Sequence, residues 1–339
     1  MRIRTVLCEA LSEDIGSVEL KEVDLPPPGD GEVQVRLYAC AVNFPDLLMI
    51  QGKYQFKPPL PFAPGGEAAG EVVARGPGVT RFDAGDAVLL SMRYGGFAEA
   101  VNVPVEEARL MPKGMDYAAA ASYQTAYLTA YVALYRRGAL QSGETLLVHG
   151  ATGGVGMAAV DLGKYFGATV IATGGRDDKL DVVKARGADH VINYTQPDGT
   201  LGGFKDEVKA LTEGRGADVI YDPVGGDVFD ESMRCINWGG RLLTIGFTSG
   251  RWPQAPVNLI LIKQIAVIGV RAGEYGRRDP VRGRENDDAL YRMAEWGDIN
   301  PHISHALPLE KAVDAMRLLE NREVVGKAVV TMNGYQYQP

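Results

Sequence analysis

The chain has 339 residues, of which 46% are hydrophobic and 23% are charged, so it is long enough for two globular domains. A net charge of −8 argues against non-specific nucleic-acid binding, although a local basic pocket for a phosphate is compatible with it. No apolar run approaches the roughly 20 residues that span a bilayer, so we expect no membrane partner.

The N-terminus and the cysteines bear on the compartment. The segment 1–8 predicts a strand rather than a signal peptide, because it is short and acidic residues follow soon. Cys8, Cys40 and Cys235 stand far apart and form no CxxC pair, so we expect no disulfide framework. These features predict a cytoplasmic protein.

Residues 1–115 alternate short apolar stretches with turns rich in proline and glycine. Short strands with frequent turn signals favour a compact β-barrel over a parallel sheet. The predicted strands of this part include 32–37, 71–74 and 86–90. From Tyr117 the composition changes, and the alanine-rich segment 118–134 predicts a helix.

The middle of the chain alternates strands that are apolar throughout with segments of helix length. Such a pattern indicates a parallel sheet covered by helices on both faces, the doubly wound or Rossmann fold. The predicted strands are 145–149, 169–173, 190–193, 218–221, 241–245 and 265–270. The predicted helices are 157–166, 179–185 and 205–211.

A glycine-rich turn follows the first of these strands and opens a predicted helix. It reads Ala151-Thr-Gly-Gly-Val-Gly156, which matches the GxGxxG fingerprint except that alanine replaces the first glycine. Small residues let the backbone approach a pyrophosphate, and the N–H groups at the helix start face it. We predict a dinucleotide-binding turn, with a purely structural turn as the alternative. The predicted contacts are Thr152, Gly153, Gly154, Val155 and Gly156.

The end of the second strand bears on which dinucleotide binds. NAD enzymes usually place an acidic residue about 20 residues after the turn, where it holds the ribose 2′-hydroxyl. Here Gly174, Gly175 and Arg176 occupy this point and Lys179 follows, which provides space and positive charge for a 2′-phosphate. The aspartates at 177–178 suit the first turn of a helix, although one of them turned inward would favour NADH. We predict NADPH.

Together these patterns predict an α/β protein with a Rossmann NADPH-binding domain at 125–271. The barrel-like catalytic domain comprises 1–124 and 272–339, because a strand at 327–330 could return to it after an amphipathic helix at 309–319. Val270 and Arg271 end the last parallel strand and could reach the cofactor, since doubly wound folds bind ligands at the carboxyl edge of the sheet.

The chain resembles the zinc-independent quinone oxidoreductases, the zeta-crystallin-like branch of the medium-chain dehydrogenase/reductase superfamily. The resemblance covers nearly the whole chain. It rests on Val42-Asn-Phe-Pro-Asp46, Gly52-Lys-Tyr54, Pro64-Gly-Gly-Glu-Ala-Ala-Gly70, the Ala151–Gly156 turn and Gly246-Phe-Thr-Ser-Gly250. It implies a chaperonin-10-like barrel and a small electrophilic substrate.

The same resemblance bears on metals. Where zinc alcohol dehydrogenases of the superfamily carry Cys and His, this chain has Asn43 and Gly66, and their four-cysteine zinc lobe is absent. Zinc prefers thiolate, imidazole or carboxylate ligands, so we expect no metal. His302 and His305 have a suggestive spacing but no evident third ligand, and the other two histidines lie in predicted strands.

The resemblance also assigns roles near the cofactor. Asn43 matches an asparagine at the nicotinamide ribose or carboxamide, Thr125 a threonine near the nicotinamide, and Tyr194 a tyrosine near the adenine phosphate. Each has a structural alternative: a turn residue before a proline, a threonine inside a helix, and a core aromatic residue.

Two later segments join this predicted site. By resemblance, the strand end formed by Ile245, Gly246 and Phe247 would line the nicotinamide end. Lys327 matches a family position near the cofactor cleft, and a solvated lysine is the alternative.

Tyr54 is the main candidate for proton transfer. Related enoyl-thioester reductases carry a tyrosine at the matching position, where it is thought to donate a proton or polarise the thioester carbonyl. A phenol with a pKa near 10 is a proton donor at neutral pH. A tyrosine that only shapes the substrate slot would look the same in the sequence, and Asp46 is expected to be structural.

These observations predict an NADPH-dependent reductase of a quinone or an α,β-unsaturated carbonyl compound. The alternatives are an enoyl-CoA or enoyl-thioester reductase, and a protein that binds NADPH without turnover. The former needs a basic-rimmed cleft for a pantetheine phosphate. The arginines at 271–284 could supply it, or could form a solvated loop. The apolar segment 260–268 predicts a strand at the sheet edge, and hence a homodimer.

Overall fold

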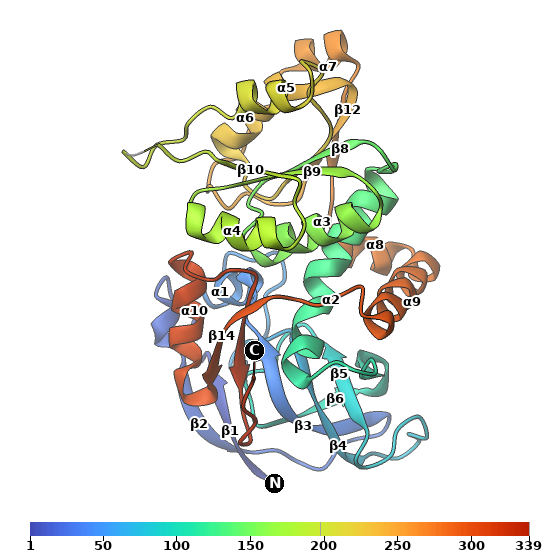
Figure 1. The fold of residues 1–339 in the computed structure, drawn as a ribbon. Coiled ribbons are helices and arrows are strands. Elements are labelled where there is room, and N and C mark those ends of the chain that lie inside the picture. The colour runs from blue at the N-terminus through green and yellow to red at the C-terminus, as the bar shows by residue number, and fades with distance from the viewer. Residues whose placement is uncertain (197, 339) are drawn as a thin grey trace. The chain divides into compact units, whose positions relative to one another are not determined.

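The structure, a computed structural model, describes residues 1–196 and 198–338 (Figure 1). It divides into two compact units, Met1–Gln124 with Tyr291–Pro339, and Thr125–Leu290. The segment 272–290 belongs to the second unit, which differs from the predicted grouping with the barrel, because its first helix packs against the helical segment 132–137 of that unit.

The first unit is built mainly from antiparallel strands. Their bounds are β1 (Arg2–Leu7), β2 (Glu19–Asp24), β3 (Glu32–Ala41), β4 (Glu67–Arg75), β5 (Ala87–Ser91), β6 (Ala100–Pro104), β7 (Ala108–Leu110), β14 (Ile303–Pro308) and β15 (Lys327–Thr331). A seven-stranded sheet has the order β14-β15-β3-β4-β5-β7, with β6 also paired to β3, and β1 pairs with β2. The return of the C-terminal strand is confirmed, since β15 pairs antiparallel with β3.

The first unit also contains short helices. They are η1 (Ile15–Ser17), α1 (Phe44–Ile50), η2 (Val105–Glu107), η4 (Leu309–Lys311) and α10 (Ala312–Glu320). The amphipathic pattern of the tail explains the last two, because Leu309, Ala312, Ala315 and Met316 are all buried in the core that the strands form. The predicted helix 309–319 is therefore confirmed.

The second unit contains a six-stranded sheet in which every pair is parallel. Its strands are β8 (Thr145–Val148), β9 (Thr169–Gly174), β10 (His190–Asn193), β11 (Ala217–Asp222), β12 (Ile236–Thr244) and β13 (Ala266–Gly269). The order β10-β9-β8-β11-β12-β13 reverses direction between β8 and β11. This is the doubly wound arrangement that the apolar strands predict, and ligands bind outside the carboxyl ends of the strands where the order reverses.

Helices lie on both faces of this sheet. They are α3 (Gly154–Tyr165), α4 (Asp177–Ala185), α5 (Lys205–Leu211), α6 (Gly226–Cys235) and α7 (Val257–Lys263). Two further helices follow β13: α8 (Ala272–Arg278), which packs against the segment 132–137, and α9 (Pro280–Trp296), which begins in the second unit and ends in the first. Figure 1 shows α3 and α4 on one face, and α5 and α6 on the other. The helix α2 (Tyr117–Tyr131) crosses the boundary between the units and continues as the π-helical segment η3 (Val132–Arg137). Among the helices of the described residues, none combines the length and apolar content that a bilayer crossing requires.

The predicted strand 260–268 is wrong in its first half. Residues Val257–Lys263 form α7, and only Ala266–Gly269 form the edge strand β13. A short apolar run fits a helix as well as a strand. Pro256 precedes the first turn of the helix, and Gln264 ends it with a left-handed φ of 52°.

Candidate active site

The turn between β8 and α3 has the geometry that close approach to a phosphate requires. Gly150 has a φ of 55°, and Gly153 is the N-cap of α3. A side chain at Gly156 would overlap the carbonyl oxygen of Gly150, whereas a Cβ added at Gly153 would meet only that oxygen, at 3.5 Å. The glycines therefore pack the helix against the turn and leave open space beside its N-terminus, which fits a pyrophosphate.

The predicted residues 152–156 all lie in this turn and in the first turn of α3. The neighbouring turn after β11 touches it, since a Cβ added at Gly150 would lie 3.3 Å from Val224 Cγ2 and 3.4 Å from Pro223 Cγ. The two turns meet at the reversal of the strand order between β8 and β11. The candidate cofactor site is thus at the usual place for this fold.

The residues proposed to select the cofactor lie at the end of β9. Gly174 ends the strand, and Arg176 is exposed at the N-terminus of α4, where its guanidinium pairs with Asp178 at 2.6 Å. Hydrogen bonding to Arg176 lowers the pKa of the Asp178 carboxyl. Asp177 is exposed and accepts a 2.8 Å hydrogen bond from Asn193 Nδ2. Neither aspartate is buried, whereas the predicted Lys179 is only 6% exposed.

Tyr194 lies beside the same strand end. Its backbone N–H donates to the carbonyl of Gly174 at 3.1 Å, and a Cβ added at Gly175 would lie 4.0 Å from its ring. The ring also packs 6.3 Å from that of Phe204, measured between centroids. The structure therefore brings Tyr194 to the predicted 2′-phosphate site, and the same residue also contributes to the core.

The turn after β12 packs on the turn after β11. Ile245 N–H donates to the Asp222 carbonyl at 2.9 Å, and Thr248 N–H donates to the Pro223 carbonyl at 3.1 Å. A Cβ added at Gly225 would lie 3.0 Å from Phe247 Cδ1. The predicted residues 245–247 thus lie at the carboxyl edge, next to the strand that borders the dinucleotide turn.

Asp222 is a buried acid at this edge that the sequence patterns did not single out. Its Oδ1 accepts N–H bonds from Val224 at 2.8 Å and Gly225 at 2.9 Å. Burial raises its pKa to about 6. Its Oδ2 has no hydrogen-bond partner among the described residues. An acid at the end of an apolar strand, just before Pro223, is the sequence signal that could have pointed to it.

His149, directly after β8, is fully buried, and both nitrogens of its ring contact side chains of the second unit. Its Nδ1 lies 2.8 Å from Thr173 Oγ1, and its Nε2 lies 2.8 Å from Ser232 Oγ. Burial lowers its pKa to about 3, so the imidazole is neutral at physiological pH. It ties β8 to β9 and α6 without contributing charge.

Three further predicted residues lie in other elements of the second unit. Val270 follows β13, and its N–H donates to the Thr244 carbonyl at 3.0 Å. Arg271 is exposed at the start of α8, and β11 and β12 separate its strand from β8. Thr125 is exposed on α2, and its carbonyl accepts a 2.7 Å hydrogen bond from Thr129 Oγ1.

The first unit holds a polar cluster inside its core. Asn43 Oδ1 accepts a 2.7 Å hydrogen bond from Lys327 Nζ, and Asn43 Nδ2 lies 3.3 Å from Glu67 Oε2. Lys327 Nζ is also 3.6 Å from Glu67 Oε2, with both side chains nearly fully buried. Lys327 is therefore not the solvated lysine of the alternative interpretation. Glu67 was missed, although it lies within the Pro64–Gly70 motif.

Asp46 supports the loop that carries Asn43. Its carboxylate accepts N–H bonds from Asn43 at 2.8 Å and from Gly65 at 3.1 Å. Burial raises its pKa to about 6, while these backbone N–H groups and the charge of Lys327 oppose that rise. The contacts agree with the predicted role of orienting the loop.

Tyr54 follows α1 and is half-buried against the core of the first unit. Its N–H donates to the Leu48 carbonyl at 3.2 Å. Close by in sequence, Phe56 stacks on Tyr94 with 6.2 Å between ring centroids, and the guanidinium of Arg93 lies 4.7 Å from the Phe56 ring centroid. The two apolar segments 54–60 and 92–97 therefore pack together.

Metal-ligating side chains do not gather in the described part of the chain, where no group of three His, Cys, Asp or Glu is placed to hold an ion. His305 Nδ1 lies 2.9 Å from Ser304 Oγ. A Cβ on Gly66 would lie 3.2 Å from the Met92 carbonyl oxygen, so even a small side chain requires adjustment there.

Comparisons with known proteins agree with this geometry. Residues 154–283 match the family "Zinc-binding dehydrogenase", and residues 29–113 match "Alcohol dehydrogenase GroES-like domain". The chain is 38% identical over 330 residues to the quinone oxidoreductase-like protein 2 homolog of Nematostella vectensis, covering 96% of this chain and 88% of that protein.

Two solved structures are also similar. The mycobacterial Rv1454c complexed with NADPH is 28% identical with a TM-score of 0.85, covering 97% of this chain and 100% of the other. The JamJ enoyl reductase in its apo form is 27% identical with a TM-score of 0.82, covering 97% and 99%. The GroES-like match confirms the predicted chaperonin-10-like first domain. The chain belongs to the medium-chain dehydrogenase/reductase superfamily, in its zinc-independent, quinone oxidoreductase-like branch.

Proposed function

We propose that this chain, an NAD(P)-dependent oxidoreductase by its family, uses NADPH to reduce a quinone or an α,β-unsaturated carbonyl compound without zinc. The observation that carries the proposal is the Gly153–Gly156 turn with its open N-terminal space, next to the neutral and basic end of β9. The bound nicotinamide supplies the hydride. Similarity to a quinone oxidoreductase-like protein and to a structure containing NADPH supports this choice.

NADPH is proposed over NADH because the strand β9 does not end in an aspartate or glutamate. Gly174 and Gly175 occupy that place, and Arg176 provides a guanidinium at the start of α4. Guanidinium groups bind phosphate oxygens in pairs, which suits a 2′-phosphate. The ion pair with Asp178 is exposed, so a phosphate can compete for Arg176 at little energetic cost.

Three side chains are proposed to act on the reacting groups. Asn43, held by Lys327 and Asp46, offers its amide to the nicotinamide ribose or carboxamide, and Thr125 contributes a hydroxyl near the nicotinamide. Tyr54 donates a proton or a hydrogen bond to the oxygen that becomes negative when hydride reaches the conjugated carbon. In a quinone, hydride and one proton together give the hydroquinone. Protons there can also come from water.

Reduction of an enoyl thioester is the second candidate. Similarity to the JamJ enoyl reductase and the arginines near the end of β13 favour it. The third candidate is NADPH binding without turnover, which uses the same turn, because a fold does not fix a function.

The deciding experiment is steady-state oxidation of NADPH and of NADH, with 9,10-phenanthrenequinone and crotonyl-CoA as acceptors, in chelator-treated protein. Turnover with NADPH that survives chelation is expected, and the better acceptor identifies the substrate class. Loss of turnover on chelation would overturn the zinc-free proposal, and saturable NADPH binding without turnover would leave the third candidate.

We also propose a homodimer in the cytoplasm. Among the described residues the edge strand β13 is paired on one side only, and the preceding α7 exposes Val257, Leu261 and Ile262, each by about 70% or more. An exposed strand edge beside apolar side chains suits pairing with the same elements of a second copy. The three buried, free cysteines suit a reducing compartment. Sedimentation of the protein tests the dimer.

A further inference from the structure

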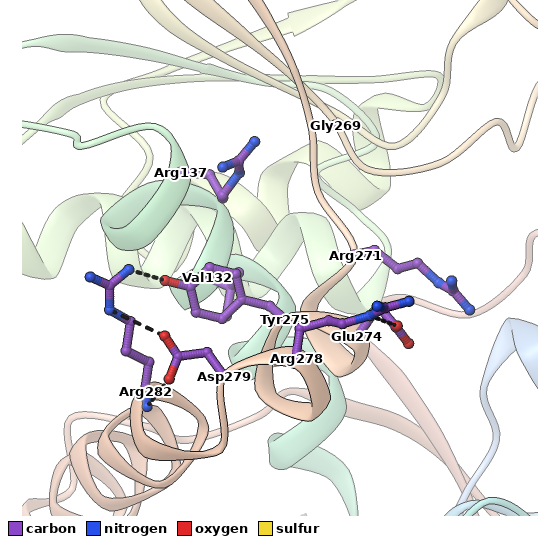
Figure 2. A pocket seen from close by; sticks show the side chains of 9 residues that line it. All are labelled: Val132, Arg137, Gly269, Arg271, Glu274, Tyr275, Arg278, Asp279 and Arg282. Atoms are coloured by element: carbon purple, nitrogen blue, oxygen red, sulfur yellow. Dashed lines mark hydrogen bonds and ion pairs between the residues drawn. The ribbon is translucent and has the colours of Figure 1, made fainter.

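A cavity of about 300 Å³ lies in the second unit, beside the end of β13 (Figure 2). Elements far apart in sequence form its wall. The lining residues are Val132, Arg137, Gly269, Arg271, Glu274, Tyr275, Arg278, Asp279 and Arg282. Figure 2 shows Arg282 and Asp279 on one side of Tyr275, and Arg271 and Arg278 on the other.

The charges of this wall are unbalanced. Arg278 pairs with Glu274 at 2.8 Å, and Arg282 lies 3.6 Å from Asp279. Among the described residues, Arg137 and Arg271 have no ion pair or hydrogen bond from their side chains. Two guanidinium groups thus remain uncompensated at one cavity of a protein whose net charge is −8.

Part of the cavity wall is apolar. Val132 and the ring of Tyr275 supply apolar surface, and the Tyr275 hydroxyl accepts a 3.3 Å hydrogen bond from Arg282 Nη1. A volume of 300 Å³ is at the lower limit of small-molecule pockets and exceeds what a single phosphate fills. Guanidinium groups beside apolar surface suit a phosphate that is attached to an organic group.

This cavity is distinct from the proposed 2′-phosphate site of the cofactor. That site is at the end of β9, four strands from β13 in the same sheet, which at a spacing of about 4.8 Å places them roughly 19 Å apart. The cavity is instead one strand away from β12, whose end at Ile245–Phe247 is proposed to line the nicotinamide. It is therefore nearer to the proposed nicotinamide end of the cofactor than to the proposed 2′-phosphate site.

We propose that this arginine cavity binds the phosphate end of an organic phosphate ester. The phosphate can belong to the carrier of an enoyl-thioester substrate, which rests on the second candidate function above, or to a free phosphate compound. The arginines at 271–284 were expected either to rim a basic cleft or to form a solvated loop, and in the structure they lie within or next to the helices α8 and α9.

The test is calorimetric titration of the full-length protein with inorganic diphosphate, crotonyl-CoA and crotonyl-pantetheine, the last of which lacks phosphate. Arg137→Gln and Arg271→Gln are each expected to weaken diphosphate and crotonyl-CoA binding about tenfold, the loss typical of one charged hydrogen bond. The double variant Arg215→Gln/Arg234→Gln removes two exposed arginines outside the cavity and is the control for net charge.

Each outcome of the titration either supports or overturns the proposal. Tight crotonyl-CoA binding that falls to the crotonyl-pantetheine level in the cavity variants identifies the thioester carrier, whereas tight diphosphate binding alone identifies a free phosphate compound. The proposal is overturned if neither diphosphate nor crotonyl-CoA binds saturably, or if the control variant weakens their binding as much as the cavity variants do. It is also overturned if NADPH displaces diphosphate. Quinone turnover by wild type and Arg137→Gln is measured in parallel, so a failure of the proposed function is seen separately.

Discussion

Lys327 Nζ donates a 2.7 Å hydrogen bond to Asn43 Oδ1 across 284 positions of sequence. The pairing of β15 with β3 makes this possible, because it sets Val329 opposite Ala41, two residues before Asn43, which is the N-cap of α1. Glu67 lies 3.6 Å from the same ammonium and is 2% exposed. The carboxylate neutralises a buried lysine, and the lysine in turn holds the amide of Asn43 in one orientation.

Replacement of Lys327 by methionine is expected to lower the free energy of unfolding by about 3–5 kcal/mol, because Glu67 is then buried without its cation. Adding Glu67→Gln is expected to recover part of that loss. Urea unfolding of both variants measures the effect, with Lys113→Met as the control at an exposed lysine of the same unit. A loss within about 1 kcal/mol, as for an exposed pair, would contradict the assignment.

Arg176→Gln tests the choice of cofactor. It is expected to weaken NADPH binding about tenfold or more and to leave NADH binding nearly unchanged, because only NADPH carries the 2′-phosphate. Asp178→Asn is expected to act in the opposite direction, since it frees the guanidinium from its 2.6 Å partner. Fluorescence titration with both dinucleotides measures the ratio, and Arg215→Gln controls for net charge. Equal weakening of both dinucleotides by Arg176→Gln would refute a role at the 2′-phosphate.

The parallel sheet and the dinucleotide turn could be predicted from the sequence because their signals are local. Strands such as Thr145–Val148 are apolar throughout, and the turn places its glycines where helix and strand approach most closely. The helix Val257–Lys263 was missed because it too could be judged only from local sequence. A run of seven mostly apolar residues has no periodicity that distinguishes a helix from a strand.

Long-range relationships could not be predicted in this way. The burial of Lys327 depends on a strand pairing that joins the two ends of the chain. The arginine cavity needs Arg137, from the end of η3, beside residues that follow β13, more than 130 positions later. Spacing along the chain indicates neither contact, because both arise from packing between elements.

Tyr54→Phe tests whether this phenol transfers a proton. With crotonyl-CoA as acceptor, kcat is expected to fall by about 10²–10⁴, the usual contribution of a positioned general acid. With 9,10-phenanthrenequinone the change is expected to be only a few-fold, since water can supply the protons. The solvent deuterium isotope effect on crotonyl-CoA reduction should change as well. A rise in KM for both acceptors at unchanged kcat would instead assign Tyr54 to the shape of the slot.

Asp222 should make the protein less stable as the pH rises. Its pKa is raised by burial from 3.8 to about 6, so the folded state binds the proton more tightly than the unfolded state does. The loss of stability that comes from ionising this buried carboxyl is absent below about pH 4, grows between about pH 4 and 6, and is complete above that. The shift corresponds to at most about 3 kcal/mol.

Asp222→Asn removes this charge and keeps Oδ1 as the acceptor for the N–H groups of Val224 and Gly225. The variant is therefore expected to be more stable than wild type at about pH 8, with the advantage disappearing near pH 4. Guanidinium unfolding at several pH values measures the difference, and Asp206→Asn is the control at an exposed carboxylate. If the variant were destabilised equally at every pH, Asp222 would matter through its hydrogen bonds alone, and the buried charge would not be a cost to the fold.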